Sequence, residues 1–352
     1  GFHSQQESAF FILRIRTLNF IIYILKKLTY LTTVLIGIII LMFIIVQSIP
    51  GDPARSAAGP AASKERLIEI RKDLGLDLPV YIQVYRYFGR VINLDLGKSI
   101  RTKKDVWDEL VLYLPASIEL VVSAMFINIF VGVLIGIYSA VKPRQIIDKL
   151  SNLITILGMG LPIFWVGIIS QLLFYNILDI FPYGGRLPAG VNPPQHQTGS
   201  YIIDSLLMWD LSLLSISLHH LILPAFIMSL PELAVTARIM RNSILNVLNK
   251  DYIITAKAKG LNQSRILFVH ALKNAMMVPI SLFGMQTGWI LGGTLLVESV
   301  FSWGGLGSLA YNAIYKRDFP IIMGVTLVIS LCFVLTNFSV EIIHKYIDKR
   351  LT

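Results

Sequence analysis

Six long runs without a charged residue constrain this chain more than any other feature. Each has the roughly 20 residues that a helix needs to cross about 30 Å of hydrocarbon. We therefore expect an all-α membrane protein with six transmembrane helices. The runs are 28–49, 120–141, 150–178, 211–231, 274–297 and 319–340.

The composition also indicates a lipid environment. The chain is 55% hydrophobic and only 15% charged, with a mean hydropathy of +0.67. A soluble core built from these residues would leave apolar surface exposed. Thr17 to Leu25 is apolar but too short to span, and we expect it to lie in the membrane interface. No cleavable signal peptide is expected, because the first long run lacks a small-residue cleavage site. We base no function on residues 1–18.

Basic residues gather on one side of the expected spans, which predicts that both termini are cytoplasmic. The opposite side has only Arg186, Lys316 and Arg317 in its short connections. Its long loop after the first run carries both signs, and such loops cross membranes largely regardless of charge. The net charge of +10 follows from this bias and from contact with anionic headgroups. A nucleic-acid partner is not needed to explain it.

These expectations divide the chain into five parts. They are a cytoplasmic or interfacial segment (1–27), the first span (28–49), an extracytoplasmic loop (50–113), a five-helix core (114–343) with a cytoplasmic loop at 250–275, and a cytoplasmic tail (344–352).

The cytoplasmic loop contains a short basic segment, DYIITAKAKG, from Asp251 to Gly260. Asp251 is a plausible N-cap and Gly260 a plausible C′ residue, so about two helical turns should lie between them. Ala256 and Ala258 would allow close approach, and Asn262 can cap a second helix. A short, capped, basic helix in a cytoplasmic loop of a membrane protein usually binds a soluble partner protein. The alternative is a basic loop that only sets topology.

Two further motifs lie on the expected external side. The loop after the first run reads IPGDPAR at 49–55, RKDLGLDLPVYIQVYRYF at 71–88 and NLDLGKSI at 93–100. Its residues 63–74 have helical periodicity. The second motif is VESVFSWGGLGSLAYNAIYKRDFP at 297–320. Its glycines permit a tight backbone, and Phe301 and Trp303 suit the membrane interface.

These motifs resemble those of ABC importer permeases for dipeptides, oligopeptides and nickel. TAKAKGL followed by HALKNAMMVPI is similar to the family's cytoplasmic EAA loop. The external phrases GDP, LGLD-P and GDLG-S occur in the family's order, with Asn93-Leu94 before Asp95 as a departure. The phrase E-x-x-F-x-W-P-G-L-G is matched except that Gly304 replaces proline. From Phe20 onward the chain resembles the first permease of these systems, which implies the type I ABC importer fold.

The resemblance implies three groups of site residues. The first would couple to an ATPase: Asp251, Tyr252, Thr255, Ala256, Lys257, Ala258, Gly260 and Leu261. The second would form part of an external gate: Glu298, Phe301, Trp303, Gly305, Gly307, Arg317, Asp318 and Pro320. The third would contact a solute-binding protein: Gly51, Asp52, Pro53, Gly75, Leu76 and Asp77. The alternatives are a structural re-entrant turn for the second group and a passive loop for the third.

We expect no catalytic or metal site in the chain. The Gly97-Lys98-Ser99 triplet is not a phosphate-binding loop, because Ile92 stands where that motif needs glycine. His219 and His220 are adjacent, and neighbours on a helix do not face one ligand. Glu119 and Glu232 lie near span ends, where they can reach water or pair with cations such as Arg238. The single cysteine, Cys332, has no partner for an intrachain disulfide.

Small residues recur every four positions in two of the runs. They are Gly132 and Gly136 in one, and Gly284, Gly288 and Gly292 in the other. This spacing lets helix backbones approach closely. We favour ordinary helix packing over the alternative, a sliding contact with a second permease.

The predicted function is that of a transmembrane permease subunit in an ATP-driven importer of the bacterial inner membrane. It would form the path for di- or oligopeptides; nickel and glutathione are alternative cargoes. An ATPase-independent transporter or channel is a more distant alternative, and a membrane enzyme is a third. The implied partners are a second homologous permease, two ATP-binding subunits that hold ATP and Mg, a solute-binding protein and the lipid bilayer.

Overall fold

The computed structural model describes residues 22, 25–27, 29–44, 54–55, 62–73, 75, 77–142, 149, 153, 158–195 and 197–347. Within them every regular element is a helix, and one isolated bridge pairs Lys98 with Asp105. This confirms the all-α prediction for the described residues. The chain divides into two compact units, Gly1–Leu96 and Gly97–Thr352, which are considered separately below.

The first unit contains one candidate span and two shorter helices. The span is Leu25–Ile44, and α3 (Lys64–Asp73) and α4 (Val80–Ile92) follow. The α3 helix confirms the helical periodicity expected at 63–74. The Tyr87 ring of α4 meets the Phe43 ring of the span edge-on, with ring centroids 5.6 Å apart. Burial raises the pKa of Tyr87 to about 12.

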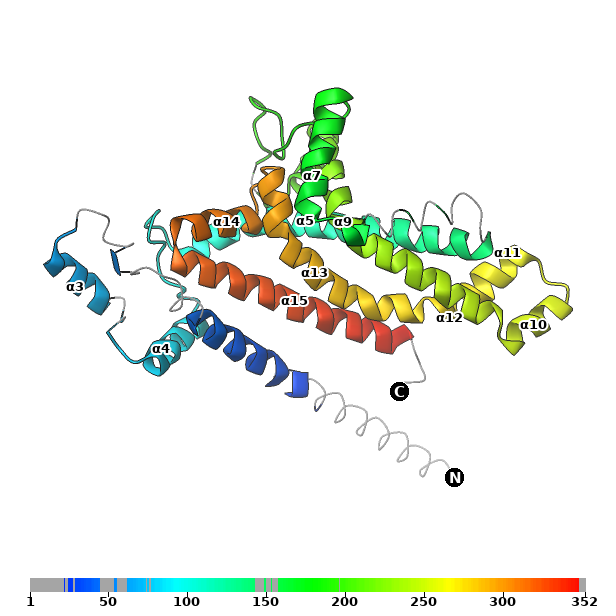
Figure 1. The fold of residues 1–352 in the computed structure, drawn as a ribbon, viewed down its shortest axis with the longest axis horizontal. Coiled ribbons are helices and arrows are strands. Elements are labelled where there is room, and N and C mark those ends of the chain that lie inside the picture. Colours follow the sequence, from blue (N-terminus) through cyan, green and yellow to red (C-terminus); the bar gives the residue numbers. More distant parts are fainter. Residues whose placement is uncertain are drawn as a thin grey trace, which may run out of the picture. The chain divides into compact units, whose positions relative to one another are not determined.

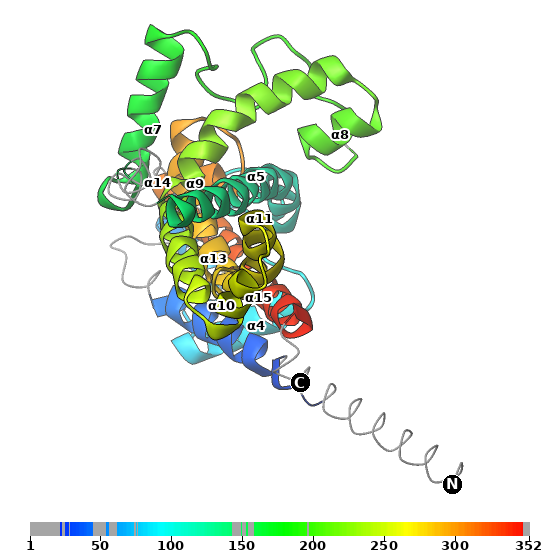
Figure 2. The same ribbon diagram turned by 90° about the vertical axis from the view of Figure 1, so that its right-hand side faces the viewer.

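The second unit is built around four long helices that run side by side over much of their length (Figures 1 and 2). They are α5 (Val106–Val141), α9 (Leu211–Leu248), α13 (Met277–Val300) and α15 (Phe319–Ile347). Shorter elements connect them: α7 (Ile163–Gln171), the π-helix η1 (Leu172–Ile177), α8 (Tyr201–Leu207), α10 (Asp251–Ala258), α11 (Gln263–Arg265), the π-helix η2 (Ile266–Ala271), α12 (Leu272–Ala275) and α14 (Leu306–Lys316).

Among the described residues, five helices are long and apolar enough to cross a membrane. They correspond to five of the six expected runs. The remaining run, 150–178, is described only in part, and there the apolar helix Ile163–Ile177 is shorter. The helices extend beyond their runs, most of all α5, which begins at Val106, and α9, which continues to Leu248. The runs end at charged residues, whereas a helix continues past a charge that has a partner or reaches solvent.

The glycine repeats are used for packing within the chain. A Cβ on Gly136 of α5 would lie 2.6 Å from the Met240 Cβ of α9. A Cβ on Gly288 of α13 would lie 2.2 Å from the Phe333 ring of α15. Gly132 and Gly284 make similar close contacts, whereas a Cβ on Gly292 would meet no atom within 4 Å. The expectation of ordinary helix packing is thus confirmed for four of the five glycines.

A polar layer crosses the bundle interior between α5, α9 and α13. The Asn128 amide nitrogen donates to the Gln286 amide oxygen at 3.0 Å. The Gln286 amide nitrogen in turn donates to the Thr236 hydroxyl at 3.0 Å. Because buried polar groups are costly without partners, this network fixes how the three helices pair.

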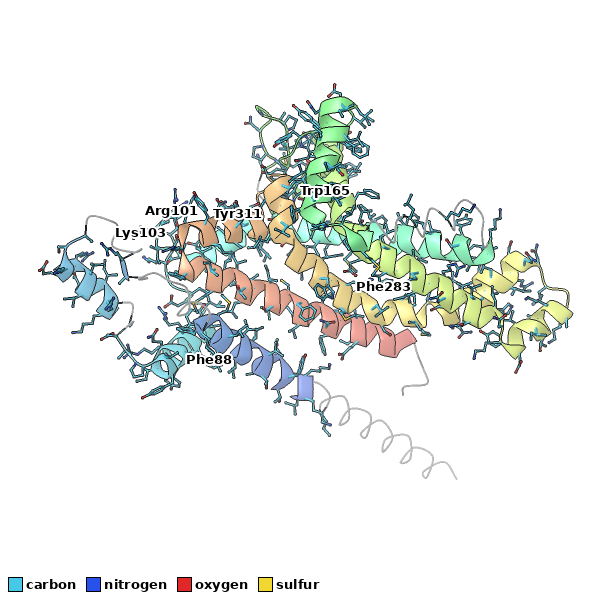
Figure 3. All side chains as sticks on the ribbon, viewed as in Figure 1. Phe88, Arg101, Lys103, Trp165, Phe283 and Tyr311 are labelled. Carbon is cyan, nitrogen blue, oxygen red and sulfur yellow. The ribbon has the colours of Figure 1, made fainter. Side chains whose placement is uncertain are left out.

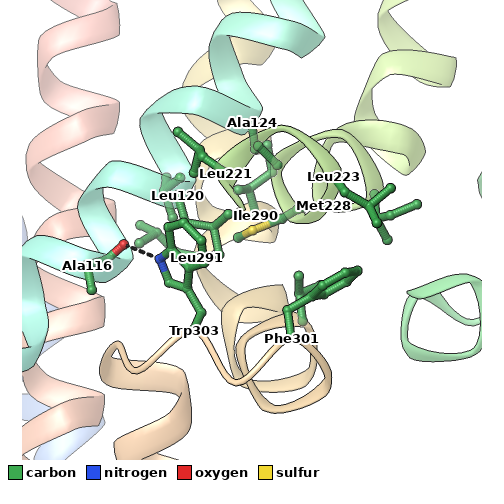
Figure 4. Packing of buried hydrophobic residues seen from close by; sticks show 14 residues of the cluster. Ala116, Leu120, Ala124, Leu221, Leu223, Met228, Ile290, Leu291, Phe301 and Trp303 are labelled. Carbon is green, nitrogen blue, oxygen red and sulfur yellow. Dashed lines mark hydrogen bonds between the residues drawn. The ribbon is translucent and has the colours of Figure 1, made fainter. Parts of the chain in front are cut away.

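An apolar cluster joins α5, α9 and α13 to the residues just after α13 (Figure 4). Phe301 and Trp303 belong to it and are only 1% and 2% exposed. The Trp303 ring nitrogen donates to the Ala116 carbonyl of α5 at 2.9 Å. These aromatic residues therefore do not face lipid, and the expectation that they lie at the depth of the membrane interface stays a prediction. Their rings fill the core between helices, where the indole N–H finds a carbonyl partner.

Candidate functional site

Two of the three expected groups lie in the second unit, where α10 and the segment between α13 and α14 are well separated (Figure 1). We call residues 250–275 the α10 loop and residues 297–308 the α14 turn.

The ends of α10 follow the sequence prediction closely, with one correction. The N-cap is Lys250, and Asp251 is the first helical residue. Asp251 is therefore not the cap, although its carboxylate in the first turn still suits the helix dipole. Gly260 has φ of +73°, and its N–H donates to the Lys257 carbonyl at 2.9 Å. This confirms its predicted C′ role. Asn262 caps α11 as expected, accepting from the Ser264 N–H at 3.1 Å.

One face of α10 packs against the rest of its own chain. Ile253 and Ala256 are 0% and 8% exposed and cluster with Ile266 and Ala271 of η2. Leu261 packs against this cluster, as do Val247 and Leu248 at the end of α9. The expectation that Ala256 contacts a partner protein is therefore wrong. A helix of two turns is marginal alone and needs one buried face to hold it in place.

The rest of the α10 surface is exposed and partly apolar. Ile254 is 56% exposed and Tyr252 is 44% exposed. The Tyr252 hydroxyl accepts from the Asn274 amide at 2.9 Å, which ties the helix to the residues that lead into α13. Thr255, Lys257 and Ala258 are also exposed. The α10 loop thus presents an isoleucine and a tyrosine among basic residues, a combination suited to contact with a protein.

Glu298 holds the α14 turn against α5. Its side chain is 0% exposed and accepts hydrogen bonds from the Ser117 hydroxyl of α5 and from the Ser308 N–H at 3.0 Å. The Ser117 oxygen also accepts from the Leu306 N–H at 2.7 Å. Since each of these groups has a buried partner, hydrogen bonds within the chain hold the turn, and these groups are not exposed at the surface.

The glycines of the α14 turn are required by this close fit. A Cβ on Gly305 would lie 2.4 Å from the Ser117 oxygen, and one on Gly307 would lie 2.5 Å from the backbone of Thr294. Gly304 has φ of +77°, which proline cannot adopt because its ring fixes φ near −65°. The glycine in place of the family's proline therefore matches the backbone of this chain.

Arg317, Asp318 and Pro320 lie where α14 meets α15. Arg317 is exposed, and its backbone is in the left-handed conformation with φ of +54°. Asp318 is 5% exposed and accepts from the Ser99 hydroxyl at 2.5 Å and from the Ile100 N–H at 3.2 Å. Pro320 lies in the first turn of α15, where its missing N–H is no loss. Ser99 of the rejected phosphate-loop triplet therefore has a structural partner.

An ion pair near the α14 turn was not predicted. Arg186 pairs with Glu119 of α5, and their side chains are 12% and 5% exposed. The guanidinium also lies 3.5 Å from the centroid of the Tyr201 ring. Glu119 further accepts from the Ser200 hydroxyl at 3.1 Å and from the Ile202 N–H at 2.9 Å. The expectation that Glu119 pairs with a cation is therefore confirmed, but the cation is Arg186 and not Arg238, and the buried carboxylate does not reach water. The available signal was that Arg186 is the single basic residue in its connection.

The adjacent histidines each bind a backbone carbonyl. His219 lies 2.8 Å from the Ile180 oxygen, and His220 lies 3.0 Å from the Gly185 oxygen. No group of three metal-ligating side chains occurs among the described residues. The two rings therefore connect α9 to the segment after η1.

The residues expected to contact a binding protein are described only in part. Gly75 follows α3 with φ of +67° and is buried, whereas Asp77 is exposed. Gly51, Asp52, Pro53 and Leu76 lie outside the described residues. Their contact role stays a prediction.

Together these features define a multi-pass membrane protein with a helix displayed at one end of its bundle, as in a membrane subunit of a transport system. The chain belongs to the family of binding-protein-dependent transport system inner membrane components, whose model matches residues 132–352. The model of that family's N-terminal region matches residues 18–121. The predicted family is thereby confirmed.

Two curated relatives illustrate the similarity. The chain is 40% identical to a probable D,D-dipeptide transport system permease protein of Escherichia coli K12, covering 91% of this chain and 94% of the relative. It is 39% identical to a dipeptide transport system permease protein of Alkalihalophilus pseudofirmus, covering 94% and 98%. Among solved structures, the inward-facing MetNI methionine ABC transporter aligns with a TM-score of 0.45 and 16% identity over 69% of this chain and 94% of that chain.

Proposed function

We propose that this chain is the transmembrane permease subunit of an ATP-driven importer and forms the path for di- or oligopeptides delivered by a solute-binding protein. Family membership supports the transport role. The names of the relatives support the cargo: two are dipeptide permeases at 40% and 39% identity, and an oligopeptide permease of Bacillus subtilis is 32% identical.

The observation that carries the coupling role is the division of α10 into two faces. Ile253 and Ala256 hold the helix against η2 and the end of α9, while Ile254 faces outward. A soluble ATPase that binds the outward face would move α9 and η2 with it, because the buried cluster joins them. Nucleotide and Mg would then be held by two ATP-binding partner subunits, and this chain would need no cofactor of its own. A second homologous permease would complete the path.

The proposed orientation places both termini and the α10 loop in the cytoplasm. It is supported by the excess of Lys and Arg on that side. A reporter fused after Thr352 should therefore be active in the cytoplasm. An external reporter would invert the assignment of every loop.

The extracytoplasmic loop 50–113 would receive the binding protein. Deletion of residues 63–74, which include α3, should abolish solute-dependent stimulation of ATP turnover while the complex stays assembled. Unchanged stimulation would show that this segment is passive.

The decisive test of the proposed function is uptake by the purified complex in vesicles. Labelled dipeptide should accumulate only with ATP and with the binding protein present. Ile254→Glu should reduce both uptake and retention of the ATPase, whereas Ile254→Leu, which keeps an apolar surface, should leave both near the wild-type level. ATP-independent uptake would instead favour a secondary transporter or channel.

Glutathione is the second candidate cargo, because the chain is 32% identical to a glutathione transport system permease protein of Salmonella paratyphi A over 326 residues. Parallel uptake of labelled glutathione and nickel would separate these cargoes from dipeptides.

A further inference from the structure

The α4 helix has a second apolar face that no described residue covers. Tyr81, Tyr85 and Ile92 are 73%, 78% and 68% exposed. Phe88, labelled on α4 in Figure 3, is half-buried and completes the row. The intervals of four, three and four residues place these side chains on one stripe of the helix. Tyr87, by contrast, is 3% exposed and faces the first span. We call Tyr81, Tyr85, Phe88 and Ile92 the α4 stripe.

Two arginines lie on the far side of α4 from this stripe. At about 100° per residue, Arg86 and Arg90 are centred roughly 150° from the middle of the α4 stripe. Both are exposed, and the Arg90 guanidinium lies 5.8 Å from the Tyr87 ring centroid. The helix therefore has an aromatic and aliphatic side and a cationic side, as helices at a membrane surface do.

The contact between Tyr87 and Phe43 fixes how far α4 can lie from the bilayer. Phe43 belongs to the candidate span Leu25–Ile44 and precedes the end of the uncharged run at Ile49 by six residues. Tyr87 thus meets the span before the chain leaves its apolar run, so α4 lies at the level of the bilayer surface.

We infer that α4 is an interfacial helix whose stripe inserts into the lipid leaflet at the surface where the first span emerges. Tyrosine is favoured at this depth because its ring is apolar and its hydroxyl reaches water. Arg86 and Arg90 would face the aqueous side.

A lipid surface fits this stripe better than a soluble protein does. A soluble partner approaches from water and would meet the arginine side of α4 first. The α3 helix, KERLIEIRKD, is rich in charges and offers a more suitable surface for such a partner. The inference thus goes beyond the proposed function: α4 would tether the loop to the membrane and leave α3 available to a binding protein.

Site-directed spin labelling of the full chain tests this placement. The single cysteine, Cys332, is first replaced by alanine. Nitroxides are then introduced by Tyr85→Cys and Ile92→Cys on the stripe, with Arg86→Cys and Arg90→Cys as matched controls on the same helix. The assembled complex is placed in nanodiscs of phosphatidylcholine and phosphatidylglycerol. Collision rates with oxygen, which partitions into lipid, and with a water-soluble nickel chelate are measured at each position.

The expected result is a several-fold higher oxygen-to-chelate ratio at positions 85 and 92 than at 86 and 90. Equal ratios at all four positions would overturn the inference. It would also be overturned if the stripe labels are water-exposed alone and become shielded only when the binding protein is added. Tyr81→Cys supplies a second stripe position if Tyr85→Cys does not assemble. Because the labels report depth without transport, failed peptide uptake would reject the proposed function alone.

Discussion

The α10 loop and the α14 turn differ in the interactions that hold them and in how much of their surface is exposed. At the α10 loop, the small apolar cluster around Ile253 and Ala256 fastens one side of a helix and leaves the other side exposed. At the α14 turn, the carboxylate of Glu298 and the glycines around it are directed inward against α5 and α13. The family motif at the α10 loop thus includes residues that are available for contact with a partner. The motif at the α14 turn consists mostly of residues that bind other parts of the same chain.

This difference predicts where substitutions act. Near the α14 turn, removing one polar group leaves its buried partners unsatisfied, which costs more than the loss of the bond itself. At α10, the outward side chains have no buried partners that a substitution would leave unsatisfied. Substitutions near the turn should therefore reduce the stability of the fold, and substitutions on the outer face of α10 should reduce coupling.

The largest effect is expected from Arg186→Ala. It leaves the Glu119 carboxylate buried without its cation, and breaking a buried pair in this way costs about 3–5 kcal/mol. Thermal unfolding of the complex in nanodiscs would measure the loss. Lys316→Ala is the control: it removes an exposed cation a few residues after the α14 turn. It should change the free energy of unfolding by less than about 0.5 kcal/mol. Similar melting temperatures for the two variants would show that the ion pair does not fasten this region.

A smaller but sharper effect is expected from Gly304→Pro, which restores the residue usual in the family. Because φ at this position is +77°, the substitution should destabilise the protein by more than about 1 kcal/mol. Gly304→Ala should cost only about 1 kcal/mol, since its Cβ meets no atom within 4 Å. A stabilised Gly304→Pro variant would contradict the left-handed backbone at the α14 turn.

At the α10 loop, Gly260→Val should weaken coupling without unfolding the bundle. No atom lies within 4 Å of a Cβ at this position, so the cost is the backbone penalty of roughly 1–2 kcal/mol. ATPase retention and peptide uptake should fall together while the melting temperature of the bundle is unchanged. Gly260→Asn is the matched control, because asparagine tolerates the left-handed region. Equal uptake by the two variants would show that the helix end is not needed in this form.

The smallest effect is a pH dependence near α8. Burial of Asp204 would raise the pKa of its carboxyl, but hydrogen bonds from the Thr198 hydroxyl and from the backbone N–H groups of residues 197–199 outweigh it and hold the pKa below the ordinary value of 3.8. The resulting stability is present above the unfolded-state pKa and is lost as pH falls through the folded-state pKa. Amide exchange at 198–204 should therefore accelerate in acid. Asp204→Asn should remove this pH dependence, and an unchanged profile in that variant would assign it elsewhere.

Sequence patterns predicted the features that depend on neighbouring residues. The left-handed Gly260 and the Asn262 cap follow from local backbone chemistry, and the spans follow from uncharged length. The N-cap was misplaced by one residue because Lys250 adopts the extended conformation before α10. The buried side of α10 was misassigned at Ala256, because a two-turn helix has too few residues to show which side is apolar.

Features that depend on distant residues could not be predicted. Arg186 and Glu119 are 67 positions apart in the sequence, and no local pattern brings them together. The burial of Phe301 and Trp303 likewise depends on α5 and α9, which pack around them. The π-helical segments η1 and η2 are only six residues long each, too short to show a periodicity of their own, so they were not foreseen.

Hydrogen exchange on the membrane-embedded chain, with and without its ATP-binding subunits, tests the central claim most directly. We predict that amides of Asp251–Ala258 gain protection when the ATPase binds, whereas amides of residues 297–308 are slow to exchange in both states. Unchanged exchange in α10, together with protection that appears only at the α14 turn, would contradict the account.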